Sequence, residues 1–198
     1  MLSGMAVAFF LAAGLAGGAE PAAPAPVPNA PVALVIQTEA GDLEIELYPE
    51  KAPGTVANFL KYVDGKFFEG GSFYRTVKPD NQPNSPAKIE VIQGGANPEK
   101  ESFAAIPLER TRDTGLSHKD GTLSMARAEP DSATSEFFVC LGDQPALDFG
   151  GARNPDGQGF AAFGRVTKGM EVARKIQLSQ AAEQKLTPAV KILKVERK

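Results

Sequence analysis

Cysteine and histidine are nearly absent from this chain of 198 residues, which has one of each, Cys140 and His118, and no tryptophan. One cysteine cannot close a disulfide within the chain, and one cysteine with one histidine is too few ligands for a Cys/His zinc site. No spaced aspartate motif of the calcium-loop type is present either, so we expect neither metal nor cofactor. Cys140 ends an apolar run, which predicts a packed thiol. His118 lies in the polar segment GLSHKDG, which predicts a surface residue.

Runs of one charge sign are also missing. The chain has 21 Lys and Arg residues against 24 Asp and Glu residues, for a net charge of −3. Without a basic stretch, binding to nucleic acid or to an anionic membrane through bulk electrostatics is excluded. The apolar share of 42% suits one compact domain with a real core.

No apolar run reaches the roughly 20 residues that a membrane-spanning helix needs. The first residues, MLSGMAVAFFLAAGLAGGAE, instead hold a run of about 15 apolar residues followed by small ones, which is typical of a signal peptide. We therefore expect a periplasmic or otherwise exported protein with no stable membrane insertion after cleavage. An uncleaved anchor is the alternative.

Proline alternates with small residues in PAAPAPVPNAP, which predicts a solvated polyproline II spacer; a ligand for a proline-binding module is the alternative. We therefore expect a signal peptide over residues 1–19, a Pro/Ala-rich linker over residues 20–31 and one globular domain over residues 32–198. No internal repeat is present in the sequence.

The domain alternates short strand-like runs with turns rich in glycine, proline and aspartate. A hairpin is predicted over residues 32–48 and a helix over residues 52–65, where apolar residues recur at helical spacing. A second helix is predicted over residues 169–177 and a last strand over residues 189–196. Many strands with few helices indicate a mainly β protein, built as a closed antiparallel barrel.

Two strands place large or charged side chains on both faces. In TSEFFVCL, Glu136 and Phe138 share one face, and Phe137 shares the other with Val139. If Phe137 fills the barrel, Phe138 lies outside, where an aromatic residue indicates a binding surface; a strand buried on both sides is the alternative. In GSFYRTV, the same alternation predicts that Arg75 faces outward while Tyr74 fills the core.

Five segments together resemble the cyclophilin family of peptidyl-prolyl isomerases: APGTVANFL at 52–60, FYR at 73–75, VIQGG at 91–95, TLSMARA to SEFFVC at 122–140, and FGRV at 163–166. The resemblance runs from about residue 32 to the C-terminus, apart from an expanded segment at residues 78–88. It implies a closed eight-stranded antiparallel barrel capped by two α-helices, with a proline pocket on the outer surface.

The resemblance also implies the site. Arg75 matches the catalytic arginine, and Gln93 matches the glutamine that helps to hold the substrate and the arginine. Substrate-binding positions fall at Phe73, Val91, Ala126, Arg127, Glu136, Phe138, Leu147 and Phe160. Among them, Phe138 matches the aromatic floor, Ala126 lies on the strand that pairs with the bound peptide, and Phe160 falls where the family often has histidine or tyrosine.

The sequence departs from the family pattern at several of these positions. Glu136 replaces the usual glutamine, Arg127 a common asparagine, Val91 a common methionine, and Ala146 a rim aromatic. A shallower pocket rim is expected, and Glu136 could pair with Arg75 or Arg127 and restrain the catalytic donor.

We expect an isomerase that accelerates rotation about Xaa-Pro bonds during folding of exported proteins. Its partners would be proline-containing polypeptide segments, and a monomer is expected. A cyclophilin-fold module that binds proline segments with little turnover is the main alternative. GQGFAA at 157–162 matches the residue pattern of a dinucleotide-binding fingerprint. Such a fingerprint leads from a strand into a helix, whereas this segment leads into a strand-like run, so we set that reading aside. A lipocalin-like barrel would need small or polar residues where Phe137 and Val139 lie.

Overall fold

The computed structural model describes residues 30–198. The predicted signal peptide and nearly all of the predicted linker lie outside the described residues. Within residues 30–198, no helix is both long and apolar enough to span a bilayer.

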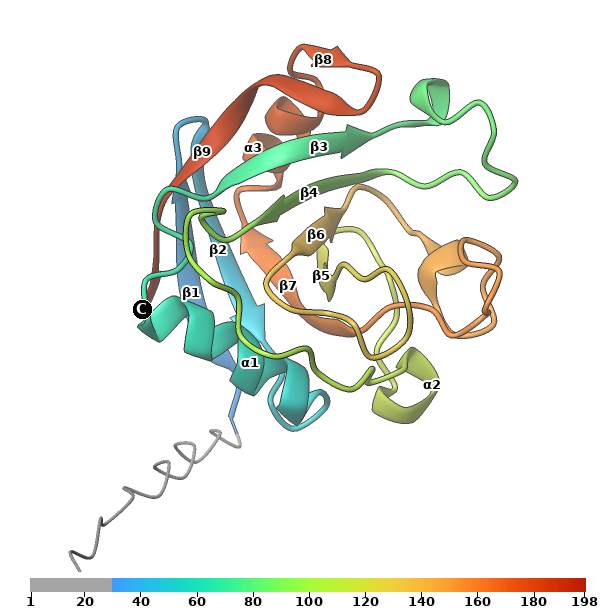
Figure 1. Ribbon diagram of the computed structural model, residues 1–198, viewed down its shortest axis with the longest axis horizontal. Coiled ribbons are helices and arrows are strands. Elements are labelled where there is room, and N and C mark those ends of the chain that lie inside the picture. Colours follow the sequence, from blue (N-terminus) through green and yellow to red (C-terminus); the bar gives the residue numbers. More distant parts are fainter. Residues whose placement is uncertain (1–29) are drawn as a thin grey trace, which may run out of the picture.

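Nine antiparallel strands form the sheet, in the order β1-β2-β7-β5-β6-β4-β3-β9-β8, and β1 also pairs with β9. That pairing closes eight strands into a barrel, with the two-residue β8 as an addition to β9 (Figure 1). The strands are β1 (Val32–Thr38), β2 (Gly41–Leu47), β3 (Ser72–Val77), β4 (Val91–Gly95), β5 (Thr122–Met125), β6 (Phe137–Cys140), β7 (Ala162–Lys168), β8 (Ala181–Ala182) and β9 (Lys185–Arg197). The predicted fold class is confirmed.

Two longer helices pack on the barrel, α1 (Pro53–Asp64) and α3 (Met170–Gln177), as the helical periodicity predicts. Figure 1 shows them on opposite sides of the barrel. Pro53 stands in the first turn of α1, where its missing N–H costs no hydrogen bond. A third helix, α2 (Thr111–Thr114), is a single turn that the sequence pattern does not predict.

The barrel interior is filled by aromatic and aliphatic side chains. Phe59 of α1 contacts Phe68, Phe137 and Phe163, with ring centroids 4.9 to 5.4 Å apart. Phe137 and Val139, which alternation places on one face of β6, have no exposed surface and belong to this core. Burial of the apolar surface of these side chains is the main stabilising contribution to the fold.

A second, smaller apolar cluster lies outside the barrel wall. It consists of Val77, Ile89, Val91, Phe138, Cys140, Leu147 and Phe160, with Ala126 and Ala146 packed against it. β6 contributes side chains to both clusters, because its alternate side chains point to opposite faces of the sheet. The outer cluster is the foundation of the candidate site.

A β-bulge in β3 corrects the expectation for Tyr74. Phe73 pairs with Gly94 and Arg75 pairs with Gln93, so Tyr74 is an extra residue on β3. The bulge therefore leaves both Tyr74 and Arg75 on the outside, and Phe73, with no exposed surface, fills the barrel. Strict alternation fails here because one inserted residue shifts the face of every residue on one side of it.

Candidate active site

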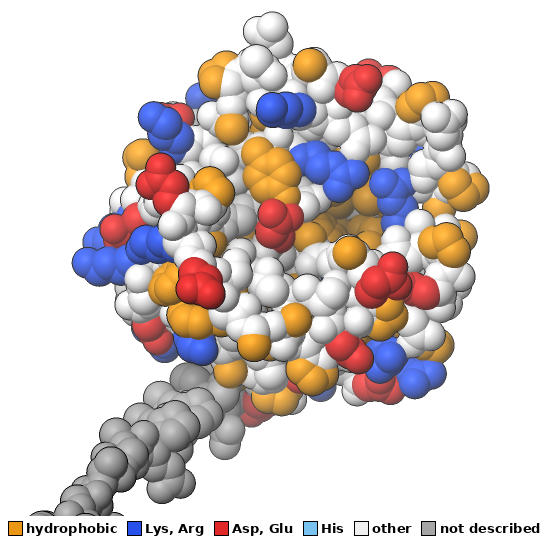
Figure 2. All heavy atoms as spheres, viewed as in Figure 1, with side chains coloured by type: hydrophobic (Ala, Val, Ile, Leu, Met, Phe, Trp, Pro, Cys, Tyr) orange, Lys and Arg blue, Asp and Glu red, His pale blue; other side chains and the backbone are white. Residues whose placement is uncertain are grey.

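An open cavity of about 470 Å³ lies on the outer face of the barrel, over β4, β5 and β6. Figure 2 shows it as a hollow with a hydrophobic floor and with Lys or Arg side chains along part of its rim. Nine of the residues predicted from the sequence line it: Arg75, Val91, Gln93, Ala126, Arg127, Glu136, Phe138, Leu147 and Phe160. Segments far apart in the chain thus meet at one place.

Phe73 is the one predicted site residue that the cavity does not include. Its ring lies in the barrel core against Phe137, with centroids 5.6 Å apart. Phe73 therefore supports the site only through the position of β3, and the prediction that it contacts substrate is not supported by its location.

The floor of the cavity is aromatic. Phe138 has 4% of its surface exposed, and its ring meets Phe160 edge-on, at 5.5 Å and 86°. Leu147, from the 3₁₀ turn Pro145–Leu147, and Val91 complete an apolar niche. A niche of this shape and chemistry suits a compact saturated ring better than a charged or extended side chain.

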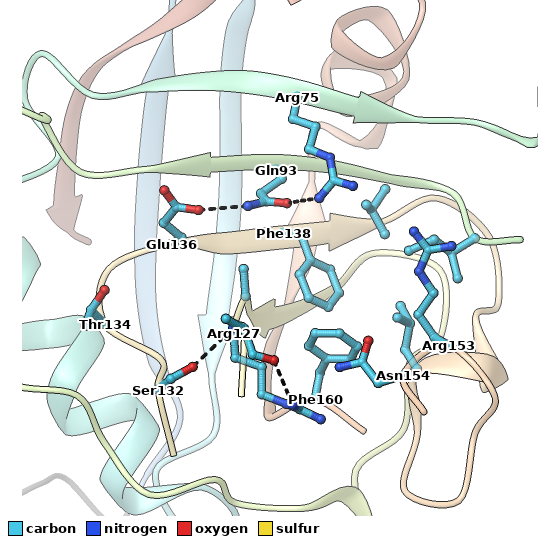
Figure 3. Close-up of a pocket in the computed structure, with 15 residues that line it drawn as sticks. Arg75, Gln93, Arg127, Ser132, Thr134, Glu136, Phe138, Arg153, Asn154 and Phe160 are labelled. Atoms are coloured by element: carbon cyan, nitrogen blue, oxygen red, sulfur yellow. Dashed lines mark hydrogen bonds between the residues drawn. The ribbon is translucent and has the colours of Figure 1, made fainter. Parts of the chain in front are cut away.

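Arg75 is held above this niche by three hydrogen bonds. Its Nη1 donates to Gln93 Oε1 at 2.8 Å, and its Nε and Nη2 both donate to Gln184 Oε1, at 2.9 and 2.6 Å. Figure 3 shows the guanidinium beside Gln93 and directed toward the Phe138 side of the cavity. A guanidinium has five N–H donors, so two remain for a ligand.

Gln184 was not predicted from the sequence. It lies between β8 and β9, 109 residues from Arg75, and its Nε2 donates to the carbonyl of Asn81 at 3.0 Å. A glutamine in a polar turn carries no local signal of such a role. The structure therefore adds Gln184 as a residue that positions the candidate catalytic arginine.

Gln184→Leu is expected to lower kcat by roughly tenfold, because a charge-assisted hydrogen bond contributes about 1.5 to 3 kcal/mol and a tenfold change corresponds to about 1.4 kcal/mol. The KM of a short Xaa-Pro peptide should change little, since the niche is intact. Gln184→Glu retains an oxygen acceptor and should restore most of kcat. A loss confined to KM, or no rescue by glutamate, would contradict the positioning role.

Glu136 corrects a second expectation. It forms no ion pair with Arg75 or Arg127; its Oε2 accepts hydrogen bonds from Gln93 Nε2, at 2.8 Å, and from the Tyr74 hydroxyl. Gln93 Nε2 also lies 2.6 Å from the Tyr74 oxygen. Burial, together with the bond to Glu136, raises the pKa of Tyr74. The bulge explains the difference, because it brings Tyr74 outward to the carboxylate.

Arg127 is a wall residue of the cavity. Its side chain is 1% exposed and forms two hydrogen bonds to Asp156, at 2.8 and 3.0 Å, and one to the carbonyl of Gly159 at 2.8 Å. The hydrogen bonds from Arg127 hold the pKa of Asp156 below its ordinary value. This guanidinium is therefore neutralised within the fold, and it packs over the ring of Phe160.

His118 is buried, contrary to the surface position expected from its polar neighbours. Its Nδ1 lies 2.7 Å from Asp148 Oδ1 and its Nε2 lies 2.9 Å from Ser124 Oγ, while the ring stacks on Phe138 with centroids 6.0 Å apart. This chain of hydrogen bonds from Asp148 through His118 to Ser124 has the arrangement of a hydrolase triad. However, Ser124 has no exposed surface for a substrate to reach. The array instead supports the floor of the cavity from behind.

His118→Leu is expected to lower the free energy of unfolding by about 2 to 3 kcal/mol, because Asp148 and Ser124 would lose a buried partner. Urea denaturation followed by circular dichroism measures the change. Lys119→Ala, one residue along and exposed, provides the control and should stay within about 0.5 kcal/mol of the parent. Equal losses for the two variants would show that the buried array contributes nothing.

Cys140 packs in the outer cluster with no exposed surface, and burial raises the pKa of its thiol. Packing is thus the role that the geometry supports. No group of three or more histidine, cysteine, aspartate or glutamate side chains within residues 30–198 is arranged to hold a metal ion.

Residues 33–197 match the family of cyclophilin type peptidyl-prolyl cis-trans isomerases. The chain therefore belongs to the cyclophilin family, whose members catalyse prolyl isomerisation. Among individual proteins, it is 38% identical over 148 residues to peptidyl-prolyl cis-trans isomerase A of Dickeya dadantii, covering 74% of this chain and 72% of that protein. It is 41% identical over 144 residues to a peptidyl-prolyl cis-trans isomerase of Acinetobacter baylyi, covering 71% and 69%.

The fold comparison agrees. A crystal structure of a Cryptosporidium parvum cyclophilin type peptidyl-prolyl cis-trans isomerase superposes with a TM-score of 0.69 at 20% identity, over 85% of this chain and 98% of that one. A crystal structure of the same protein in the presence of the dipeptide Ala-Pro gives a TM-score of 0.68 at 22% identity, over 84% and 98%. At this identity the likeness establishes the barrel architecture.

Proposed function

We propose that this protein is a peptidyl-prolyl cis-trans isomerase that uses the cavity over β4, β5 and β6. One observation carries the proposal: the Arg75 guanidinium is fixed by Gln93 and Gln184 above an apolar niche floored by Phe138. Proline-binding alone needs the niche but has no need of a fixed cationic donor.

Cis-trans isomerisation of an Xaa-Pro amide requires rotation about a bond, and no covalent bond is broken. Resonance across the peptide bond opposes its rotation with a barrier of about 18 to 20 kcal/mol, and only at Xaa-Pro are the two isomers close in energy. As the amide twists, the nitrogen lone pair leaves conjugation and becomes a better hydrogen-bond acceptor. A donor placed near that nitrogen therefore binds the twisted state more strongly than either planar state, which is what acceleration requires.

The residues divide this work. The niche of Phe138, Leu147 and Phe160 holds the prolyl ring and so fixes one side of the bond. Arg75 supplies the donor, and Gln93 holds it at 2.8 Å while its own amide is fixed by Glu136. Because Glu136 is already occupied by Gln93 and Tyr74, it does not withdraw Arg75 from the substrate.

A binding module with little turnover is the second candidate. Ala146 leaves the rim of the niche without the aromatic side chain that the family pattern has there, and Glu136 replaces a neutral amide. These two departures from the family's catalytic pattern motivate the binding reading, whereas the retained pair of Arg75 and Gln93 favours turnover.

Turnover and binding measured on one Xaa-Pro peptide test the proposal. An isomerase should accelerate cis-trans exchange in a protease-coupled assay at enzyme concentrations far below that of the peptide. A binding module should saturate in a titration with the same peptide and leave the exchange rate at its uncatalysed value.

The physiological setting is proposed from the N-terminal sequence, whose apolar run followed by small residues supports export, with residues 1–19 as a signal peptide. Its clients would then be exported proteins that fold in the periplasm. N-terminal sequencing of the secreted form tests cleavage.

A monomer is proposed as well, since only Leu178 and Leu193 are large hydrophobic residues with high exposure within residues 30–198.

A further inference from the structure

Two guanidinium groups at the cavity lack a carboxylate partner. Arg75 and Arg153 both line it, and within residues 30–198 neither has a carboxylate oxygen within 4.0 Å. Both side chains are partly buried. Partly buried cations are normally paired, because water no longer screens them fully.

The other two charged residues that line the cavity already have hydrogen-bond partners. Arg127 is bound by Asp156 through two hydrogen bonds. Glu136 is bound by Gln93 and Tyr74, and Figure 3 shows it on the opposite side of the cavity from Arg153. The cavity therefore has a side with excess positive charge, at Arg153 and Arg75, and a side that carries a carboxylate.

Arg153 is held in place by the expanded segment between β3 and β4. Its Nη1 donates to Gln82 Oε1 at 2.8 Å, to Ser85 Oγ at 2.6 Å and to the carbonyl of Ala87 at 2.9 Å. Its Nε and Nη2 have no acceptor within residues 30–198. Arg153 thus has a fixed position and free donors.

Arg75 and Arg153 both line this cavity and a second one beside it. Burial, and then the positive charge of Arg75, lower the pKa of Arg153. No carboxylate within residues 30–198 forms an ion pair with either group, whereas a carboxylate bound in the cavity that both line would offset their charge. Arginine is well suited to this because its planar fork binds a carboxylate through two parallel bonds.

A second cavity gives a polypeptide room to continue past the arginines. It has a volume of about 1200 Å³, shares Arg75 and Arg153 with the first, and is walled by residues 80–86 and by the turn at residues 182–185. Figure 1 shows the β3–β4 connection, in green, reaching outward on the same side as the orange loop between β6 and β7. The charged residues Asp80, Glu183 and Lys185 line this cavity but are exposed.

We propose that Arg153, together with Arg75, makes the site selective for polypeptide segments with an aspartate or glutamate close to the proline, on the side that leaves the niche past Arg153. The inference rests on the proposed isomerase function, whose substrate class it narrows. An acidic residue on the other side of the proline would approach Glu136 and would be disfavoured.

The test compares peptides that differ only in glutamate or glutamine, placed next to an Ala-Pro bond on one side or the other, by exchange NMR at low salt. For one placement, the parent protein should show kcat/KM about three to ten times higher for glutamate than for glutamine, as a partly exposed ion pair allows. The preference should shrink in 0.5 M salt, because added salt screens exposed charges.

The matched variants assign the preference to Arg153. Arg153→Gln should bring the glutamate to glutamine ratio to about one, and Arg153→Lys should retain part of it. Lys191→Gln makes the same charge change at an exposed site away from the cavity and should keep the parental ratio.

A ratio of one at both placements in the parent protein, or a preference that survives in Arg153→Gln, would overturn the inference. Absence of turnover on every peptide would instead reject the proposed function. In that case, the same ratio measured as dissociation constants by calorimetry still tests whether Arg153 selects acidic segments.

Discussion

Arg75→Ala is expected to lower kcat/KM for an Xaa-Pro peptide by about two to four orders of magnitude. The two N–H donors that the fold leaves free on Arg75 would be lost, and each charge-assisted hydrogen bond formed mainly in the twisted state contributes roughly 1.5 to 3 kcal/mol. The protease-coupled assay measures the loss directly. Peptide affinity should fall much less, since the apolar niche does not depend on Arg75.

Arg75→Lys separates charge from geometry. A lysine ammonium retains the positive charge but has a single nitrogen, so it cannot reach Gln93, Gln184 and the substrate together in the manner of the planar fork. We expect a rate between those of the parent and the alanine variant. Equal rates for the parent and Arg75→Ala would reject the mechanism, and unfolding curves that coincide for all three proteins would show that the comparison concerns catalysis alone.

Replacing Phe137 and replacing Phe138, which are adjacent on β6, are expected to have different effects: the first on stability and the second on turnover. Phe137→Ala should lower the free energy of unfolding by about 3 to 5 kcal/mol, since its ring is fully buried against Phe59, Phe68 and Phe73 and the barrel cannot close around the void. Urea denaturation measures this loss. Turnover by the fraction that stays folded should remain near the parental value.

Phe138→Ala should show the reverse. The void it leaves opens into the cavity, where water enters, so the loss of stability should be clearly smaller than for Phe137→Ala. The niche loses its floor, and kcat/KM should fall by about tenfold or more, through both KM and kcat, as roughly 1.5 to 3 kcal/mol of apolar contact with the prolyl ring is removed. If Phe138→Ala proved the more destabilising of the two, or left turnover unchanged, the division of β6 into a core face and a site face would be wrong.

Local pattern was sufficient for much of this molecule. Alternation in β6 predicts that Phe137 and Phe138 lie on opposite faces of the sheet, because a strand repeats every two residues whatever surrounds it. Helical spacing and the position of Pro53 predict α1 in the same way. The family resemblance then predicts most of the cavity, including Arg75 and Gln93, since these positions follow from short motifs.

Other features depended on contacts between distant parts of the chain. The bulge that turns Tyr74 outward is set by the pairing of β3 with β4, and the burial of His118 requires Asp148, which lies 30 residues further on. Gln184 reaches Arg75 across 109 residues, and Arg153 reaches Ser85 across 68. The sequence by itself therefore determined the strands, the long helices and the donor over an apolar niche, because these follow from local periodicity and motif. Only the tertiary structure decided which polar groups surround that donor, because hydrogen bonds between remote side chains form once the barrel has closed.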